Sequence, residues 1–149
     1  MIQRIQTVFL LLITLISITL FFVPFVAYTT AQKTYSVDLL PGHSAGFSPV
    51  YYVPVVFNII NMILSVVVIL QFKKRIFQIK MASLLMAFSA ILLGTMLLFD
   101  FVDVGPNAVL SKAYLPGAYL PIVSILLAFL SIRFIRKDEE LVRSADRLR

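Results

Sequence analysis

Two asparagines and a serine share one face of an apolar segment. Asn58, Asn61 and Ser65 are spaced by three and four residues, which places them on neighbouring positions of a helix. An amide without a hydrogen-bond partner in apolar surroundings costs free energy, so we expect these side chains to bond to another helix or to water. Three interpretations remain open: hydrogen bonds between helices, a polar path for a ligand or ion that also uses hydroxyl groups of the first helix, or a contact to another subunit.

Asp100 and Asp103 form a second polar pair, at the end of the third apolar segment. Their spacing puts both carboxylates on one helical face. The C-terminal end of a helix carries partial negative charge, so the pair needs solvent or a cation such as Lys112. The pair is either solvated at the membrane interface or an entry site for a proton or cation, because ionisable groups near membrane depth are functional candidates.

Small residues follow a helical stripe through the third apolar segment. They are spaced by four, three and four residues: Ser83, Ala87, Ala90 and Gly94. Small side chains let helix backbones approach closely in lipid. The stripe predicts the main packing seam of the bundle, and the alternative is a docking groove for a helix of a partner protein.

The side chains of common catalytic and metal sites are largely missing from the sequence. The chain has no cysteine, and its one histidine, His43, stands in a segment rich in Gly, Pro and Ser. A zinc site would need carboxylates in place of Cys and a second His, which the ligand preferences of zinc disfavour. The sequence contains no nucleophile elbow and no phosphate-binding glycine loop. We therefore predict a protein that is not an enzyme and holds no cofactor or metal.

Four long apolar segments must position these residues. Hydrophobic residues make up 60% of the chain and the mean hydropathy is +0.99, whereas a soluble domain is roughly 45–50% apolar. We predict helices at about residues 4–26, 51–72, 79–102 and 118–136, each about long enough to cross a bilayer. The predicted fold class is all-α: residues 1–149 form one transmembrane domain, an integral membrane four-helix bundle. Residues 34–39 also alternate in a way compatible with a short strand.

Basic residues predict the orientation of this bundle. Eleven of the 13 Lys and Arg residues lie on one side of the four segments, leaving Lys33 and Lys112 on the other. Positively charged flanks stay in the cytoplasm. We therefore predict a multi-pass protein of the cytoplasmic (inner) membrane, with N and C termini cytoplasmic and extracytoplasmic loops at about residues 29–50 and 105–117. The basic charge reports topology rather than nucleic-acid binding, and the first helix is expected to remain as an uncleaved anchor.

The cytoplasmic tail, residues 137–149, mixes acidic, basic and apolar residues. Leu141, Ala145 and Leu148 are spaced by four and three residues, and Glu139 stands four residues before Arg143. Both patterns favour a helix. Mixed charge suits a specific protein contact better than a polybasic lipid clamp. The tail is therefore a candidate docking element for a partner, with contact residues Glu139, Glu140, Leu141, Arg143, Asp146 and Arg147.

Both ends of the chain resemble a known family. The opening MIQRIQT and the closing RFIRKDEELVRSADRLR resemble the domain of unknown function 4293 (DUF4293) family, four-helix membrane proteins of Bacteroidota. The resemblance implies an inner-membrane location and supplies no activity, so it assigns no catalytic or ligand residue. It directs attention to the cytoplasmic ends, where Gln3, Gln6 and Thr7 are expected to meet the tail.

These observations favour a non-enzymatic accessory or assembly subunit of a membrane complex. The expected partners are the lipid bilayer and a membrane protein or a second copy of the chain, contacted through the third helix and the tail, with no nucleic acid. The alternative is a small cation- or solute-transporting protein or channel component, which would use the Asn58 and Asn61 face with Asp100 or Asp103. An enzyme acting on lipid ranks third.

Overall fold

Four helices dominate the computed structural model, which describes residues 3–30, 34–40, 52–72, 74–98 and 109–147. They are α1 (Gln3–Thr19), α2 (Tyr52–Leu70), α3 (Arg75–Leu97) and α4 (Leu120–Arg147), and a short 3-10 helix, η3 (Pro116–Tyr119), leads into α4. Among the residues that the structure describes, three apolar stretches are long enough to cross a membrane: Tyr52–Leu70, Arg75–Leu97 and Pro116–Val142. The apolar part of α1, Ile5–Thr19, is shorter.

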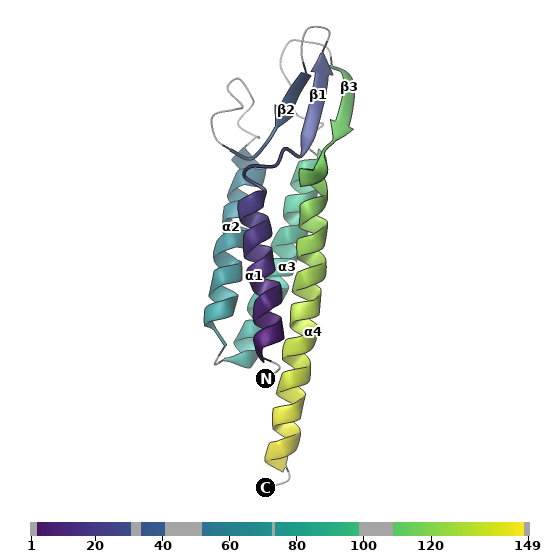
Figure 1. The fold of residues 1–149 in the computed structure, drawn as a ribbon. Helices are drawn as coiled ribbons and strands as arrows, with labels where there is room; N and C mark the ends of the chain where they lie inside the picture. The colour runs from purple at the N-terminus through teal and green to yellow at the C-terminus, as the bar shows by residue number, and fades with distance from the viewer. Residues whose placement is uncertain (1–2, 31–33, 41–51, 73, 99–108, 148–149) are drawn as a thin grey trace.

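The helices run side by side as a bundle (Figure 1). α1 packs against α2 and α4, and α3 packs against the same two helices, so successive helices are neighbours and α4 closes the ring onto α1. α1 begins and α4 ends at the same end of the molecule, which we call the charged end (Figure 1). α4 continues without a break through 28 residues, about 42 Å at 1.5 Å per residue, and so extends well beyond its neighbours.

A three-stranded antiparallel sheet caps the opposite end, and this corrects the all-α prediction (Figure 1). The strands are β1 (Val26–Thr30), β2 (Thr34–Val37) and β3 (Val109–Tyr114), in the order β2-β1-β3. β1 pairs with β2 through Val26 and Val37, and with β3 through Val26 and Tyr114. The segments predicted as two loops thus meet in one sheet, because β1 lies between them.

The sheet also explains why α1 ends at Thr19 rather than near residue 26. Pro24 has no N–H with which to continue a helix, and the following Val26–Thr30 is rich in β-branched residues. Gly117 closes this junction by donating its N–H to the Pro24 carbonyl oxygen at 3.1 Å. A Cβ at Gly117 would lie 2.7 Å from that oxygen, so only glycine fits there.

The outer surface of the bundle is apolar, and its interior contains many polar side chains. Large residues such as Leu15, Ile63 and Leu126 are more than half exposed. Two apolar clusters fill the interior, one beneath the sheet around Phe25 and Met96 and one toward the charged end around Leu10 and Leu85. Between and beside them lie buried polar residues: Gln6, Ser17, Asn58, Asn61, Ser65, Gln78, Ser89, Ser124 and Ser131.

Candidate functional site

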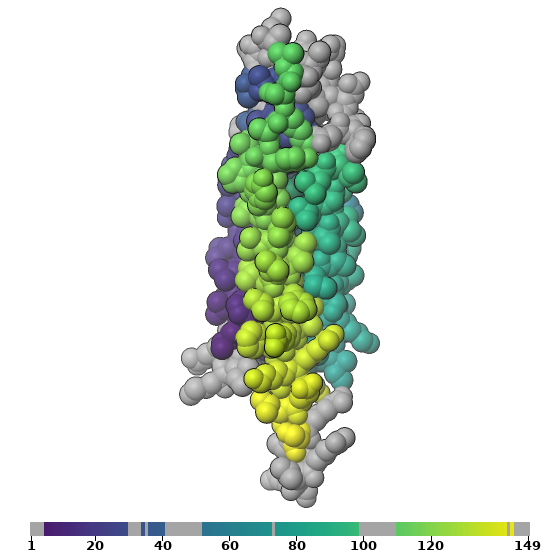
Figure 2. Space-filling model, turned by 90° about the vertical axis from the view of Figure 1, so that its right-hand side faces the viewer, coloured from purple at the N-terminus to yellow at the C-terminus, as the bar shows by residue number. Residues whose placement is uncertain are grey.

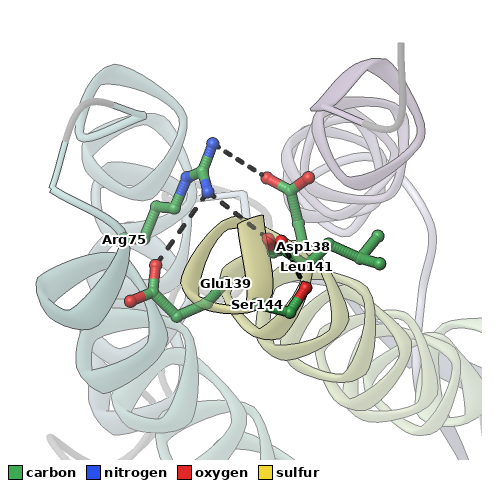
Figure 3. Close-up of polar contacts among 5 residues, drawn as sticks. All are labelled: Arg75, Asp138, Glu139, Leu141 and Ser144. Carbon is green, nitrogen blue, oxygen red and sulfur yellow. Dashed lines mark hydrogen bonds and ion pairs between the residues drawn. The ribbon is translucent and has the colours of Figure 1, made fainter. Parts of the chain in front are cut away.

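At the charged end, Arg75 fastens α4 to the start of α3 (Figure 3). Its Nη2 lies 3.2 Å from Oδ2 of Asp138, and Nη1 donates to the Asp138 backbone oxygen at 3.4 Å. Glu139 adds a longer ion pair at 4.0 Å. The Arg75 and Asp138 side chains are only 23% and 15% exposed, so solvent screens this contact less than an open surface pair. The contact therefore holds the last turns of α4 in a defined direction.

Beyond this contact, α4 presents apolar side chains to the surroundings. Leu141 and Val142 are 49% and 40% exposed, and Figure 2 shows the end of α4 (yellow) extending past α1 and α3. The Ser144 hydroxyl turns back to the Leu141 carbonyl oxygen at 2.8 Å, as Figure 3 shows. Of the other predicted tail residues, Glu140 is exposed, while Arg143, Asp146 and Arg147 belong to α4 with side chains outside the described part.

An open groove of about 640 Å³ lies between the start of α3 and the end of α4. Its walls combine cations, one acid and three apolar side chains: Lys74, Arg75, Ile76, Phe77, Lys80, Glu139 and Val142. Sequence reasoning missed this pairing of elements, because Arg75 and Asp138 are 63 positions apart and no local spacing connects them. It expected Gln6 near the tail, but Gln6 is 4% exposed and buried in the bundle.

The asparagine face lies inside the bundle and bonds to other helices. Asn58 Nδ2 donates to the Ser17 carbonyl oxygen of α1 at 2.9 Å. Asn61 Oδ1 accepts from the Ser89 hydroxyl of α3 at 3.2 Å, and the Ser65 hydroxyl lies 2.8 Å from that of Thr14 in α1. The structure thus brings the three predicted residues together with Ser17, Ser89 and Thr14. Five of these six residues are less than a tenth exposed, Thr14 being the exception.

Several polar atoms in this interior have no hydrogen-bond partner. They are Gln6 Oε1, Asn58 Oδ1, Asn61 Nδ2, Gln78 Oε1 and Ser131 Oγ. Buried polar atoms are nearly always paired in folded proteins, with water where no protein group reaches them. The buried polar residues of the described part include no charged side chain. The described part of the interior therefore offers neutral hydrogen-bonding side chains, so a cation bound there would contact side-chain amide and hydroxyl oxygens or backbone carbonyl oxygens.

The small-residue stripe does not form the packing seam, which corrects the prediction. Ala87 and Ala90 are exposed, and a Cβ added to Gly94 would meet nothing within 4 Å. α3 instead buries a neighbouring face: Gln78, Ala82, Leu85, Ser89, Leu92 and Met96. Larger side chains fill the space between α3 and its neighbours, so close backbone approach is not needed. Ser83 and Gly94 are half-buried, and the alternative use of the stripe as a docking groove stays a prediction.

The remaining candidates belong to the sheet end. Asp100, Asp103 and His43 lie outside the described residues. Lys112, the expected cation near the aspartates, lies in β3 and donates from Nζ to the Tyr114 hydroxyl at 2.9 Å. Burial, and secondarily the neighbouring Tyr114, raise the pKa of Tyr28 above its ordinary value of 10.0. Within the described ranges, no group of three or more His, Cys, Asp or Glu side chains is placed to hold a metal ion.

Comparison with known proteins identifies the family without naming a function. No curated protein matches the chain, and no solved structure does. One family model matches residues 2–148, nearly the whole chain, and its description is a domain of unknown function, DUF4293. The chain therefore belongs to the DUF4293 family.

Proposed function

We propose that the protein is a multi-pass protein of the cytoplasmic membrane that serves as a non-enzymatic accessory or assembly subunit. The apolar outer surface supports a lipid environment, because exposed Leu, Ile and Val side chains around the whole bundle would be costly in water. The excess of Lys and Arg at the charged end supports a cytoplasmic location for both termini. α4 is about 12 Å longer than a hydrocarbon core of ~30 Å, so its charged last turns project into the cytoplasm.

One observation carries the subunit proposal: α4 is fixed by Arg75 while Leu141 and Val142 beyond that contact stay exposed. Leu141 and Val142 follow the charged run Arg136–Glu140, so we place them beyond the hydrocarbon core although they are the last residues of the apolar span. Covering exposed apolar side chains there with a partner would lower the free energy. Since the helix is already formed and oriented, binding costs less conformational entropy than docking a flexible tail would. The helix and the adjacent groove with Ile76 and Phe77 thus fit a partner helix with apolar anchors.

The experiment is gentle-detergent purification of tagged full-length protein, followed by mass spectrometry of copurifying proteins. We expect a stoichiometric partner or a second copy of the chain with the native protein. The double variant Leu141→Ala/Val142→Ala should lose it, because both exposed anchors are shortened. Leu126→Ala is the matched control, since Leu126 is also exposed on α4 but lies near the middle of the apolar span Pro116–Val142, whereas Leu141 and Val142 are its last two residues. Equal recovery from both variants would contradict the subunit proposal.

A second candidate, transport of a cation or small polar solute, is favoured by the unpartnered Asn58 Oδ1 and Asn61 Nδ2. Both asparagines are less than a tenth exposed in the bundle interior, where a solute or water could form the missing hydrogen bonds to these atoms. Proteoliposomes containing the purified protein should then show a flux that falls when Asn61 or Asp100 is replaced by Ala. Flux equal to that of empty liposomes would leave the subunit role as the better account.

A further inference from the structure

A second groove lies on a different face of α4 from the one that contains Arg75. Its volume is about 510 Å³, and its walls follow one face of α4: Phe129, Ile132, Arg133, Arg136, Lys137 and Glu140. Successive residues are spaced by three or one positions and alternate ones by four, so they lie beside one another along one face of the helix. Three cations face one acid, which gives the groove an excess of positive charge.

The cations of this groove form no ion pair with an acidic side chain of the described residues. Arg133, Arg136 and Lys137 are exposed, and no ion pair or hydrogen bond engages their head groups within the described residues. Arg75, by contrast, already contacts both Asp138 and Glu139 in the other groove. Three cationic side chains on adjacent turns can donate hydrogen bonds to one group that carries several negatively charged oxygens. Each guanidinium group can donate two such hydrogen bonds in parallel.

Apolar and basic residues are separated along the groove. Phe129 is 53% exposed and Ile132 is 6% exposed, and both precede the first cation of the groove. The cations begin one position later and continue toward the charged end. Because a phospholipid has the same order, acyl chains followed by a phosphate, it fits both parts of the groove, whereas inorganic phosphate fits only the basic part.

We propose that this groove is a binding site for an anionic phospholipid of the cytoplasmic leaflet. Arg133, Arg136 and Lys137 bind the headgroup phosphate, and an acyl chain lies along Phe129 and Ile132. Basic pockets on the cytoplasmic side of membrane helices recognise anionic headgroups by this charge complementarity. The inference rests on the membrane placement given above and not on the partner role of Leu141 and Val142.

Lipid binding to purified full-length protein in a neutral detergent tests this inference. Native mass spectrometry, with dioleoyl phosphatidylglycerol or dioleoyl phosphatidylcholine titrated in separate arms, gives the affinity for each lipid. We expect tighter binding of phosphatidylglycerol, and a loss of roughly thirtyfold in its affinity in Arg133→Gln/Arg136→Gln, since each cation near an anionic headgroup contributes about 1 kcal/mol. The matched control is Lys74→Gln/Lys80→Gln, which removes two exposed cations at the same end and should keep the preference. An equal loss in both double variants would overturn the site, because it would show diffuse attraction.

Two further arms separate the remaining outcomes. Inorganic phosphate at millimolar concentration should not displace phosphatidylglycerol, and efficient displacement would contradict a lipid site. Arg133→Lys/Arg136→Lys keeps the charge but loses paired donation, so it should bind with intermediate affinity and provides a folded variant if the Gln substitutions disturb the helix. Leu141→Ala/Val142→Ala should bind lipid as the native protein does, so loss of a protein partner and loss of this site are distinguishable.

Discussion

The two ends of the molecule differ in how completely the fold covers them. At the sheet end, β1 pairs on both sides, buried Val26 and Val37 pack over the helices, and Gly117 lies against Pro24 without room for a side chain. At the charged end, Arg75 holds α4 in direction but leaves Leu141 and Val142 uncovered. The difference is the basis of our proposal that the charged end binds a partner, whereas the contacts at the sheet end close the fold.

The largest expected effect is at the sheet end. Gly117→Ala forces a Cβ to 2.7 Å from the Pro24 carbonyl oxygen, and backbone atoms cannot yield cheaply. We expect a loss of about 1–3 kcal/mol in the free energy of unfolding, measured by denaturation in mixed micelles. Gly94→Ala is the matched control, because its Cβ meets no atom within 4 Å and Ala favours a helix. Comparable stability of the two variants would show that the junction is not tightly closed.

The interior between the two ends should contribute the next largest effect. Ser89→Ala removes the hydroxyl that donates to Asn61 Oδ1, and Asn61→Ala removes its acceptor. We expect a coupling free energy of about 0.6–2 kcal/mol from a double-mutant cycle on these two residues. A coupling near zero would mean that this bond does not hold α2 to α3, and it would favour a solute-binding role for Asn61.

A smaller effect on global stability is expected at the charged end. Arg75→Ala removes the contacts to Asp138 and Glu139. Partly buried ion pairs of this kind contribute about 1 kcal/mol or less, so the bundle should remain folded. Hydrogen exchange of residues 138–147 should nevertheless quicken several-fold, because α4 loses its fixed direction. Lys74→Ala, next to it and exposed, should leave exchange unchanged, and equal exchange in both variants would contradict the role given to Arg75.

The smallest effect concerns alkaline pH at the sheet end. The raised pKa of Tyr28 means that the folded state holds the phenol proton more tightly than the unfolded state. This contribution to stability is fully present below pH 10 and is lost as the pH rises through the higher folded pKa. Tyr28→Phe should therefore reduce the loss of stability above pH 10. An unchanged alkaline profile in denaturation measurements would show that Tyr28 is not the responsible group.

Local patterns predicted that there are four helices and their order along the chain, but they predicted the end of α1 and the contacts between distant segments poorly. The apolar segments gave α2 to within two residues, because composition alone decides where a long apolar helix runs. The sheet was missed because β1 pairs with β3, about 85 positions later in the chain. The five residues of β1 also show no clear alternation of apolar and polar side chains that would mark a strand. Only the alternation at residues 34–39 hinted at it.

The candidate sites show the same limit. Asn58, Asn61 and Ser65 could be placed on one buried face, since their spacing fixes it, but the partners Ser17, Thr14 and Ser89 depend on how the helices pack. The stripe from Ser83 to Gly94 was predicted to be the packing seam, but α3 packs through a neighbouring face. Small residues allow close packing only where another helix lies against them. The contact of Arg75 with Asp138 required the three-dimensional arrangement.

Cysteine labelling across the membrane tests the central claim most directly, because the native chain has no cysteine. Ser36→Cys places an exposed thiol in β2, and Ser144→Cys places one at the charged end of α4. We predict that a membrane-impermeant maleimide labels the Ser36→Cys protein in cells whose outer envelope has been made permeable to the reagent while the cytoplasmic membrane stays intact. The Ser144→Cys protein should react only after the cytoplasmic membrane is opened. Labelling of Ser144→Cys before that step would contradict the cytoplasmic placement of the charged end and the docking role assigned to it.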